Sequence, residues 1–171
     1  NETSEIWQLI LNPHAGGGRG ARDRDKIVRL LKKSGIEVQL AVSQYPGHAV
    51  KLACELARQG ATRFIAAGGD GTLNEVVNGF FSCGEELCQK ITIGVLPVGT
   101  GNDWIKTFGI PDDYQQAIDI LKRGKSVSQD LGEISFEVDG VLHKRYFANS
   151  AGFGFDAVVA NHANRMKEEG A

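Results

Sequence analysis

The segment from Gly68 to Glu75, Gly-Gly-Asp-Gly-Thr-Leu-Asn-Glu, holds the residue types best suited to chemistry in this chain. An apolar run, Phe64 to Ala67, leads into it, and the residues after it have helical character. A strand, a glycine turn and a helix in that order bring backbone N–H groups to the positive end of a helix. Glycine also lets a bulky anion approach the backbone. The segment predicts a phosphate-binding turn, in which the Asp70 carboxylate binds a cation or orients a donor.

The same residues also allow a simpler interpretation. Thr72-x-x-Glu75 matches a capping box, in which Thr72 caps the helix and Glu75 reaches back to its amide. A glycine turn that binds no ligand would fit this segment as well. The other loops of the chain provide the evidence that distinguishes these two interpretations.

The composition describes an ordinary globular chain. Its 171 residues, 42% of them hydrophobic, suffice for one domain and the beginning of another. A net charge of −2 gives no basic field for nucleic acid, so we expect no nucleic-acid partner. No apolar run approaches the roughly 18 residues that span a bilayer, and the first residues do not resemble a signal peptide. We expect a cytoplasmic protein with transient, peripheral membrane contact, and the sequence leaves a homodimer open.

Cys54, Cys83 and Cys88 are odd in number and lack zinc-like spacing with histidine. Free thiols in a reducing cytoplasm are the expected state, and a Cys83–Cys88 disulfide stays open.

Apolar periodicity divides the first two-thirds of the chain into alternating strands and helices. The predicted strands span residues 6–11, 37–42, 64–67 and 91–96, and the predicted helices span 21–34, 48–59, 102–108 and 113–123. This order predicts an α/β fold with an open, mostly parallel, Rossmann-like sheet and right-handed crossovers.

The pattern changes near residue 128. Ile134, Phe136 and Val138 alternate with polar residues, and Asp139-Gly140 predicts a two-residue hairpin turn. We therefore expect a nucleotide-binding domain at 1–127 and the beginning of a β-rich second domain, truncated here, at 128–171. Two strands cannot bury their own apolar face. Either the rest of that domain is absent from this chain, or the hairpin docks on the first domain or on another chain.

Glycine-rich polar loops follow all four predicted parallel strands. They span residues 12–18, 43–48, 68–74 and 97–103. Ligands bind to open parallel sheets at the carboxyl ends of the strands, where these loops converge. Four converging loops favour the phosphate-binding hypothesis more strongly than any single motif.

Individual side chains at this edge keep two interpretations each. Asn12 could bind a nucleotide or brace its turn, and Ser43 could face a ligand or cap the strand end. His48 could act at the site or be a surface histidine without a function. Thr100-x-x-Asp103 matches a second capping box, so we expect Thr100 to cap a helix and also to meet phosphate.

Three arginines, Arg19, Arg22 and Arg24, follow the first glycine loop. They could clamp phosphate or face a membrane, but neighbouring acidic residues favour a solvated start of a helix. Neither a P-loop nor a dinucleotide Gly-x-Gly-x-x-Gly occurs in the sequence. Backbone amides and a divalent cation would therefore have to hold the phosphates.

Five motifs run in order through nearly the whole chain. They are Asn12-Pro13-x-Ala15-Gly16, Gly47-His48-Ala49, Gly68-Gly69-Asp70-Gly71-Thr72-x-Asn74-Glu75, Pro97-x-Gly99-Thr100-Gly101-Asn102-Asp103 and Asn149-x-x-Gly152-x-Gly154-x-Asp156. This set resembles the diacylglycerol kinase catalytic-domain family, most closely its soluble bacterial lipid kinases, to which sphingosine and ceramide kinases are related. The resemblance implies an NAD kinase/phosphofructokinase-like sheet followed by a β-sandwich.

The implied activity is transfer of the γ-phosphate of ATP to the hydroxyl of diacylglycerol or a similar lipid, which forms phosphatidic acid or its equivalent. The implied cofactors are ATP and Mg²⁺, with Asp70 in a carboxylate and water network near the metal. By the same resemblance, the ATP-binding residues are Asn12, Pro13, His14, Ala15, Gly16, Ser43, Gly68, Gly69, Asp70, Gly71, Thr72, Leu73, Asn74, Glu75, Thr100, Gly101, Asn102 and Asp103.

Length is the main departure from the family, whose members are about twice as long. Their metal-binding carboxylates and general base would lie beyond residue 171. We therefore expect this chain to bind nucleotide weakly and to catalyse poorly or not at all. The lipid is not evident from the sequence, because Trp104, Ile105 and Phe108 suit a core as well as an acyl-chain groove.

Two alternatives remain open at this stage. The NAD kinase family shares Gly-Gly-Asp-Gly-Thr, although its later Asn-Glu motif is not evident here. A non-catalytic nucleotide sensor that regulates a partner would also suit a chain without the catalytic carboxylates.

Overall fold

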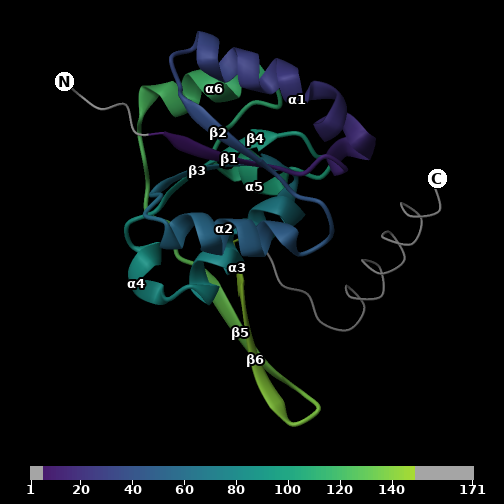
Figure 1. Ribbon diagram of the computed structural model, residues 1–171, viewed down its shortest axis with the longest axis vertical. Coiled ribbons are helices and arrows are strands. Elements are labelled where there is room, and N and C mark those ends of the chain that lie inside the picture. Colours follow the sequence, from purple (N-terminus) through teal and green to yellow (C-terminus); the bar gives the residue numbers. More distant parts are fainter. Residues whose placement is uncertain (1–5, 149–171) are drawn as a thin grey trace.

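Four parallel strands form the central sheet of the computed structural model, which describes residues 6–148 (Figure 1). They are β1 (Trp7–Leu11), β2 (Val38–Val42), β3 (Arg63–Gly68) and β4 (Thr92–Pro97). Their order is β2-β1-β3-β4, and Leu11 lies opposite both Val42 and Ala67. The predicted parallel α/β sheet is confirmed, with strand ends within one residue of prediction.

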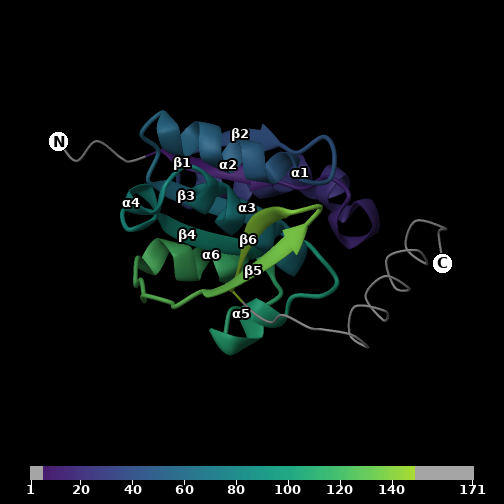
Figure 2. The same ribbon diagram turned by 90° about the horizontal axis from the view of Figure 1, so that it is seen from below.

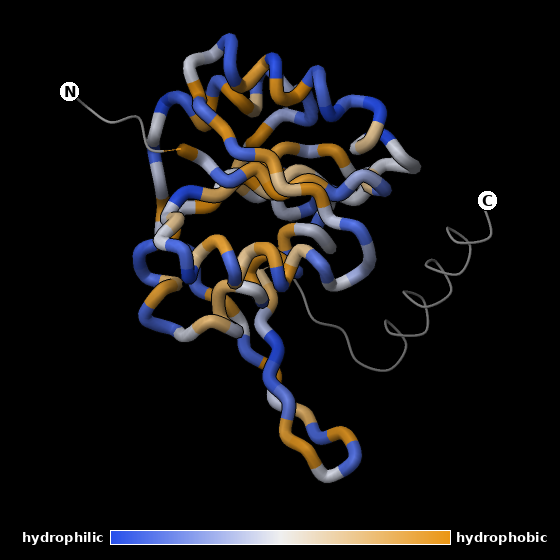
Figure 3. Tube along the Cα trace, viewed as in Figure 1, coloured by the Kyte–Doolittle hydropathy of each residue, from blue (hydrophilic) through white to orange (hydrophobic). Residues whose placement is uncertain are grey.

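Helices cover both faces of the sheet (Figure 1). Helices α1 (Ala15–Lys33) and α6 (Tyr114–Arg123) lie on one face, and α2 (His48–Arg58) and α3 (Asp70–Ser82) lie on the other. Alternate strand residues supply the two cores, since Leu9 and Leu11 pack toward α1 while Ile10 packs toward α2 and α3. Figure 3 shows the apolar residues gathered along the sheet. The shorter helices are α4 (Glu85–Cys88) and α5 (Asp103–Thr107).

Helix α1 begins earlier than the apolar pattern predicts. Its first residues include Gly16, Gly17 and Gly18, whose φ angles of 61°, 62° and 83° are left-handed rather than helical. Gly16 also lies against the loop after β4, because a Cβ there would come within 2.3 Å of the Val98 carbonyl oxygen. Glycine at this position therefore meets two constraints, backbone conformation and close approach.

The predicted hairpin is present and docks on helix α3. Strands β5 (Gly132–Val138) and β6 (Val141–Phe147) pair antiparallel, and Asp139 and Gly140 form the turn with φ angles of 51° and 77°. The Tyr146 ring stacks on Phe81 of α3 at 3.9 Å between centroids. Figure 1 shows the hairpin extending away from the α/β layers beside that helix, and Figure 2, the view from below, shows it in front of those layers. The predicted domain boundary at residue 128 stays a prediction.

The distal part of the hairpin carries its most exposed apolar side chains, Val141 and Leu142. Figure 3 shows this apolar end far from the sheet. In the described part of the chain, no helix combines the length and apolar character needed to cross a membrane.

The expectation of free thiols is wrong for two of the three cysteines. Cys54 of α2 and Cys83, which follows α3, form a disulfide, and Cys88 is free. The alternative Cys83–Cys88 pairing is therefore also wrong. The pairing follows from the close packing of α2 and α3, which brings Cys54 and Cys83 together. The helices lie so close that a Cβ at Gly79 of α3 would be 2.4 Å from the Val50 carbonyl oxygen of α2.

Candidate functional site

The carboxyl ends of β1 and β3 form the topological switch point of the sheet, where the strand order reverses. Asn12 follows β1, and its N–H donates to the Ala67 carbonyl of β3 at 3.0 Å. Its side-chain Nδ2 donates to Thr72 Oγ1 at 3.3 Å, while Oδ1 accepts the His14 N–H at 2.9 Å. Asn12 therefore braces its own turn and ties the first glycine loop to helix α3.

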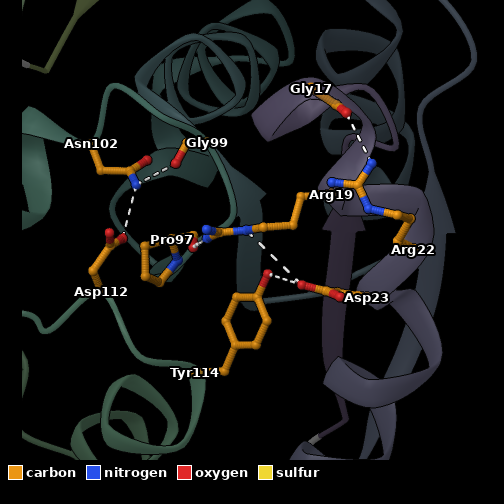
Figure 4. Close-up of polar contacts among 9 residues, drawn as sticks. All are labelled: Gly17, Arg19, Arg22, Asp23, Pro97, Gly99, Asn102, Asp112 and Tyr114. Carbon is orange, nitrogen blue, oxygen red and sulfur yellow. Dashed lines mark hydrogen bonds and ion pairs between the residues drawn. The ribbon is translucent and has the colours of Figure 1, made fainter.

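The arginines after this loop bind protein groups. Arg19 donates to the carbonyl of Pro97 at the end of β4, and its guanidinium lies over the Tyr114 ring (Figure 4). Arg22 donates to the Gly17 carbonyl at 3.1 Å, and exposed Arg24 pairs with its neighbouring aspartate. The prediction of a solvated helix start holds for Arg24 and is wrong for Arg19, because β4 and α6 provide partners that lie far away in the sequence.

Tyr114 completes this contact between α1 and α6. Its hydroxyl donates to Asp23 Oδ2 at 2.8 Å (Figure 4). Burial and then this hydrogen bond raise the pKa of Tyr114 to about 12. The cluster of Arg19, Asp23 and Tyr114 thus fixes the start of α1 against the end of β4.

The turn after β3 is built differently from the predicted capping box. Gly69 is the N-cap residue of α3, and no side chain caps the helix. Thr72 lies buried inside the first turn and accepts from Asn12, while Glu75 Oε1 accepts the Gly47 N–H at 3.1 Å. The capping-box prediction is wrong because both side chains find partners in other loops.

The Asp70 carboxylate binds the start of helix α5. Its carboxylate oxygens accept the N–H groups of Asp103 at 2.8 Å and Trp104 at 3.1 Å, which open helix α5. Its own N–H donates to the Gly101 carbonyl at 3.3 Å. Asp70, rather than Thr100, therefore caps α5, and the second predicted capping box is also wrong.

Asn102 and Ser43 are buried polar residues at this edge of the sheet. Asn102 Nδ2 donates to the Gly99 carbonyl at 2.7 Å and to Asp112 Oδ1 at 3.1 Å (Figure 4). The Ser43 N–H donates to the Leu11 carbonyl, and the His48 ring stacks on Tyr45 at 4.6 Å. These contacts hold the loops after β2 and β4 in place.

A cavity of about 430 Å³ opens beside the N-terminus of α3. Its lining includes Asp70, exposed Gly71, Glu75, Asp103 and, from the hairpin, Arg145. Asp103 pairs with the Lys106 ammonium at 2.6 Å, and this hydrogen bond raises the pKa of Lys106. In the first turn of α3, the Asp70 N–H donates to the Gly101 carbonyl, and the Thr72 and Leu73 N–H groups donate to the Gly69 carbonyl. The N–H of Gly71, which lines the cavity, is therefore the first-turn group best suited to an anion.

The predicted site residues divide into two groups. Those from Asn12 to Gly16, Gly68 to Thr72 and Thr100 to Asp103 come together at the carboxyl edge of the sheet. Leu73 and Asn74 also line the cavity, but Leu73 is mostly buried in the core and the Asn74 amide donates to the Tyr146 carbonyl of the hairpin.

Sequence reasoning missed Asn78, Tyr146 and Arg145. A signal for the first was present, because Asn74 and Asn78 lie four residues apart and share one face of α3.

Residues 7–134 match the family model of the diacylglycerol kinase catalytic domain. The chain belongs to this family. The motif from Asn149 to Asp156, which the resemblance also used, lies outside the described residues. Membership favours the lipid kinase hypothesis over NAD kinase.

Curated members of the family resemble this chain over most of its length. A diacylglycerol kinase of Staphylococcus saprophyticus is 33% identical over 147 residues, which cover 86% of this chain and 44% of the relative. A protein of Cronobacter sakazakii named "Probable lipid kinase YegS-like" is 34% identical over 160 residues, which cover 93% and 50%. The chain thus spans about half the length of these relatives.

A crystal structure of a diacylglycerol kinase from Bacillus anthracis has the same fold as this chain. It superposes with a TM-score of 0.65 at 24% identity, over 86% of this chain and 46% of that one. At this identity the likeness supports the fold alone.

Proposed function

We propose that this chain is the nucleotide-binding half of an ATP-dependent lipid kinase, which transfers the γ-phosphate to the hydroxyl of diacylglycerol or a similar lipid. The observation that carries the proposal is the junction of the two glycine loops at the switch point, where Asn12 bonds to Thr72. Ligands of parallel sheets bind at such a point. Family membership supplies the reaction class, phosphoryl transfer.

In this proposal the protein acts by positioning and by stabilising charge, the main needs of phosphoryl transfer. The first-turn N–H of α3 that receives a phosphate of ATP is that of exposed Gly71, which lines the cavity. Asp70 keeps α5 and the loop before it in register with α3 through its two amide contacts. The Arg19 contact to Pro97 keeps the first glycine loop close to the same edge.

The residues present fit a magnesium ion that enters with the nucleotide. Asp70 and Asp103 line one cavity, and Mg²⁺ is commonly held by one or two carboxylates together with substrate phosphates and water. Among residues 6–148, no cluster of three or more acidic, histidine or cysteine side chains could hold a metal alone. When bound, the ion would neutralise charge on the phosphates.

The lipid hydroxyl also needs a proton acceptor within hydrogen-bond reach. We propose that this acceptor lies outside this chain, which spans about half the length of its relatives, and that the protein meets its substrate by transient contact with the membrane surface. The chain should therefore bind ATP but turn over slowly on its own.

Labelled Mg·ATP incubated with a total bacterial lipid extract tests this function. The proteins compared are this chain, a longer form that includes a complete second domain, and the Asp70→Ala variant of each. We expect label in phosphatidic acid or another phospholipid with the longer form, and its loss in the variant. Rapid lipid labelling by the 171-residue chain would contradict the location of the acceptor. Label in NAD and not in lipid would replace the proposal with an NAD kinase.

A further inference from the structure

Two asparagines of α3 hold the hairpin by its backbone. Asn78 Oδ1 accepts the Tyr146 N–H at 2.9 Å, and Asn78 Nδ2 donates to the Tyr146 carbonyl at 2.8 Å. Asn74 Nδ2 adds a third bond to the same carbonyl at 3.1 Å. With the Phe81 ring stacked on Tyr146, these contacts fix β6 relative to the helix that begins at the phosphate-binding turn.

This attachment brings Arg145 to the cavity beside Asp70 and Gly71. Successive side chains of a strand point to opposite faces, so Arg145 and its neighbour Lys144 differ in surroundings. Lys144 pairs with Glu133 across the hairpin at 3.0 Å. Arg145 instead lines the cavity, which makes the two cations a matched pair for experiment.

The carboxylates around this cavity already have partners elsewhere. Asp70 accepts two amides of α5, Asp103 binds Lys106, and Glu75 accepts the Gly47 N–H. Within residues 6–148, none of them forms an ion pair with Arg145. The exposed guanidinium therefore remains available for an anion that enters the cavity.

We propose that Arg145 binds the terminal phosphate of ATP and so acts as a specificity residue for nucleoside triphosphates. This inference rests on the proposed function. A guanidinium offers a planar fork of donors that matches phosphate oxygens in a bidentate way. Arg145 approaches Gly71 from the hairpin, whereas the Asn12 loop approaches α3 from β1. A nucleotide that reaches from the switch point into the cavity brings its last phosphate to the arginine.

Calorimetric titration of the chain with Mg·ATP and with AMP tests the proposal. We expect Arg145→Gln to weaken ATP binding about 10-fold or more, as for loss of hydrogen bonds to a charged group, and to leave AMP binding within about twofold. Arg145→Lys should recover part of the ATP affinity, because it restores the charge without the fork. Lys144→Gln is the control and should bind both nucleotides as the unchanged chain does.

The attachment through Asn78 gives a second, independent test. Asn78→Ala frees Tyr146, so it should also weaken ATP binding, and adding Arg145→Gln to it should change little further. Equal ATP affinity in Arg145→Gln and the unchanged chain would overturn this inference alone, as would an equal loss of ATP and AMP affinity. If the unchanged chain binds neither nucleotide, the proposed function fails and this inference fails with it.

Discussion

Replacing Asp70 by alanine removes both hydrogen bonds that its carboxylate accepts from the start of α5. The two bonds, 2.8 Å to the Asp103 N–H and 3.1 Å to the Trp104 N–H, are charge-assisted and partly exposed. Loss of one capping side chain costs about 0.5–2 kcal/mol, so loss of this double contact should cost about 2 kcal/mol. For a chain of this length, that lowers the midpoint of thermal unfolding by roughly 4–8 °C.

Asp113→Ala provides the matched control. Asp113 caps α6 through one bond to the Gln116 N–H at 3.0 Å, and its loss should cost about 1 kcal/mol. Both variants should therefore unfold at lower temperature by differential scanning calorimetry. Only Asp70→Ala should also lose ATP affinity, because Asp70 lines the cavity. An unchanged unfolding midpoint in Asp70→Ala, or an equal loss of ATP affinity in both variants, would refute this reasoning.

Three further predictions concern stability. Because the pKa of Tyr114 is raised to about 12, the folded state keeps a proton that the unfolded state loses near pH 10, so the free energy of unfolding should fall from about pH 10 to 12. Urea titrations should show a smaller fall for Tyr114→Phe than for the unchanged chain. Gly79→Ala should lower the urea midpoint although alanine favours helices, because its Cβ would press on the Val50 carbonyl; a midpoint equal to or above that of the unchanged chain would contradict this packing. Reduction of the Cys54–Cys83 disulfide, which joins positions 29 residues apart, should cost about 3 kcal/mol, and scanning calorimetry with and without reductant would reveal no shift if the bond is absent in solution.

Local patterns in the sequence predict the elements of this fold well. Period-two alternation and Asp139-Gly140 predict the hairpin, and the buried apolar runs predict the four parallel strands. These features follow from backbone preference and from which residues are apolar. Both act over a few residues, so the sequence alone suffices.

Polar partners across the fold are less predictable. Thr72 matches a capping box, yet Asn12, 60 residues away, is its partner. Cys54 meets Cys83 because α2 and α3 pack closely, a geometry that no local pattern contains. The same holds for Tyr146, whose backbone binds α3 68 residues earlier in the chain. The sequence could therefore predict that the glycine loops converge, but not which side chains connect them.

Mapping of backbone amide shifts by NMR during titration with Mg·ATP tests the central claim most directly. If the two glycine loops at the switch point bind the phosphates, the largest shifts should fall on amides of residues 12–18 and 68–74. Smaller shifts should fall on Thr100 and on Arg145, while the amides near Gly35, at the opposite edge of the sheet, should stay unchanged. Shifts confined to that opposite edge, or no shifts at millimolar ATP, would contradict a nucleotide site in this crevice.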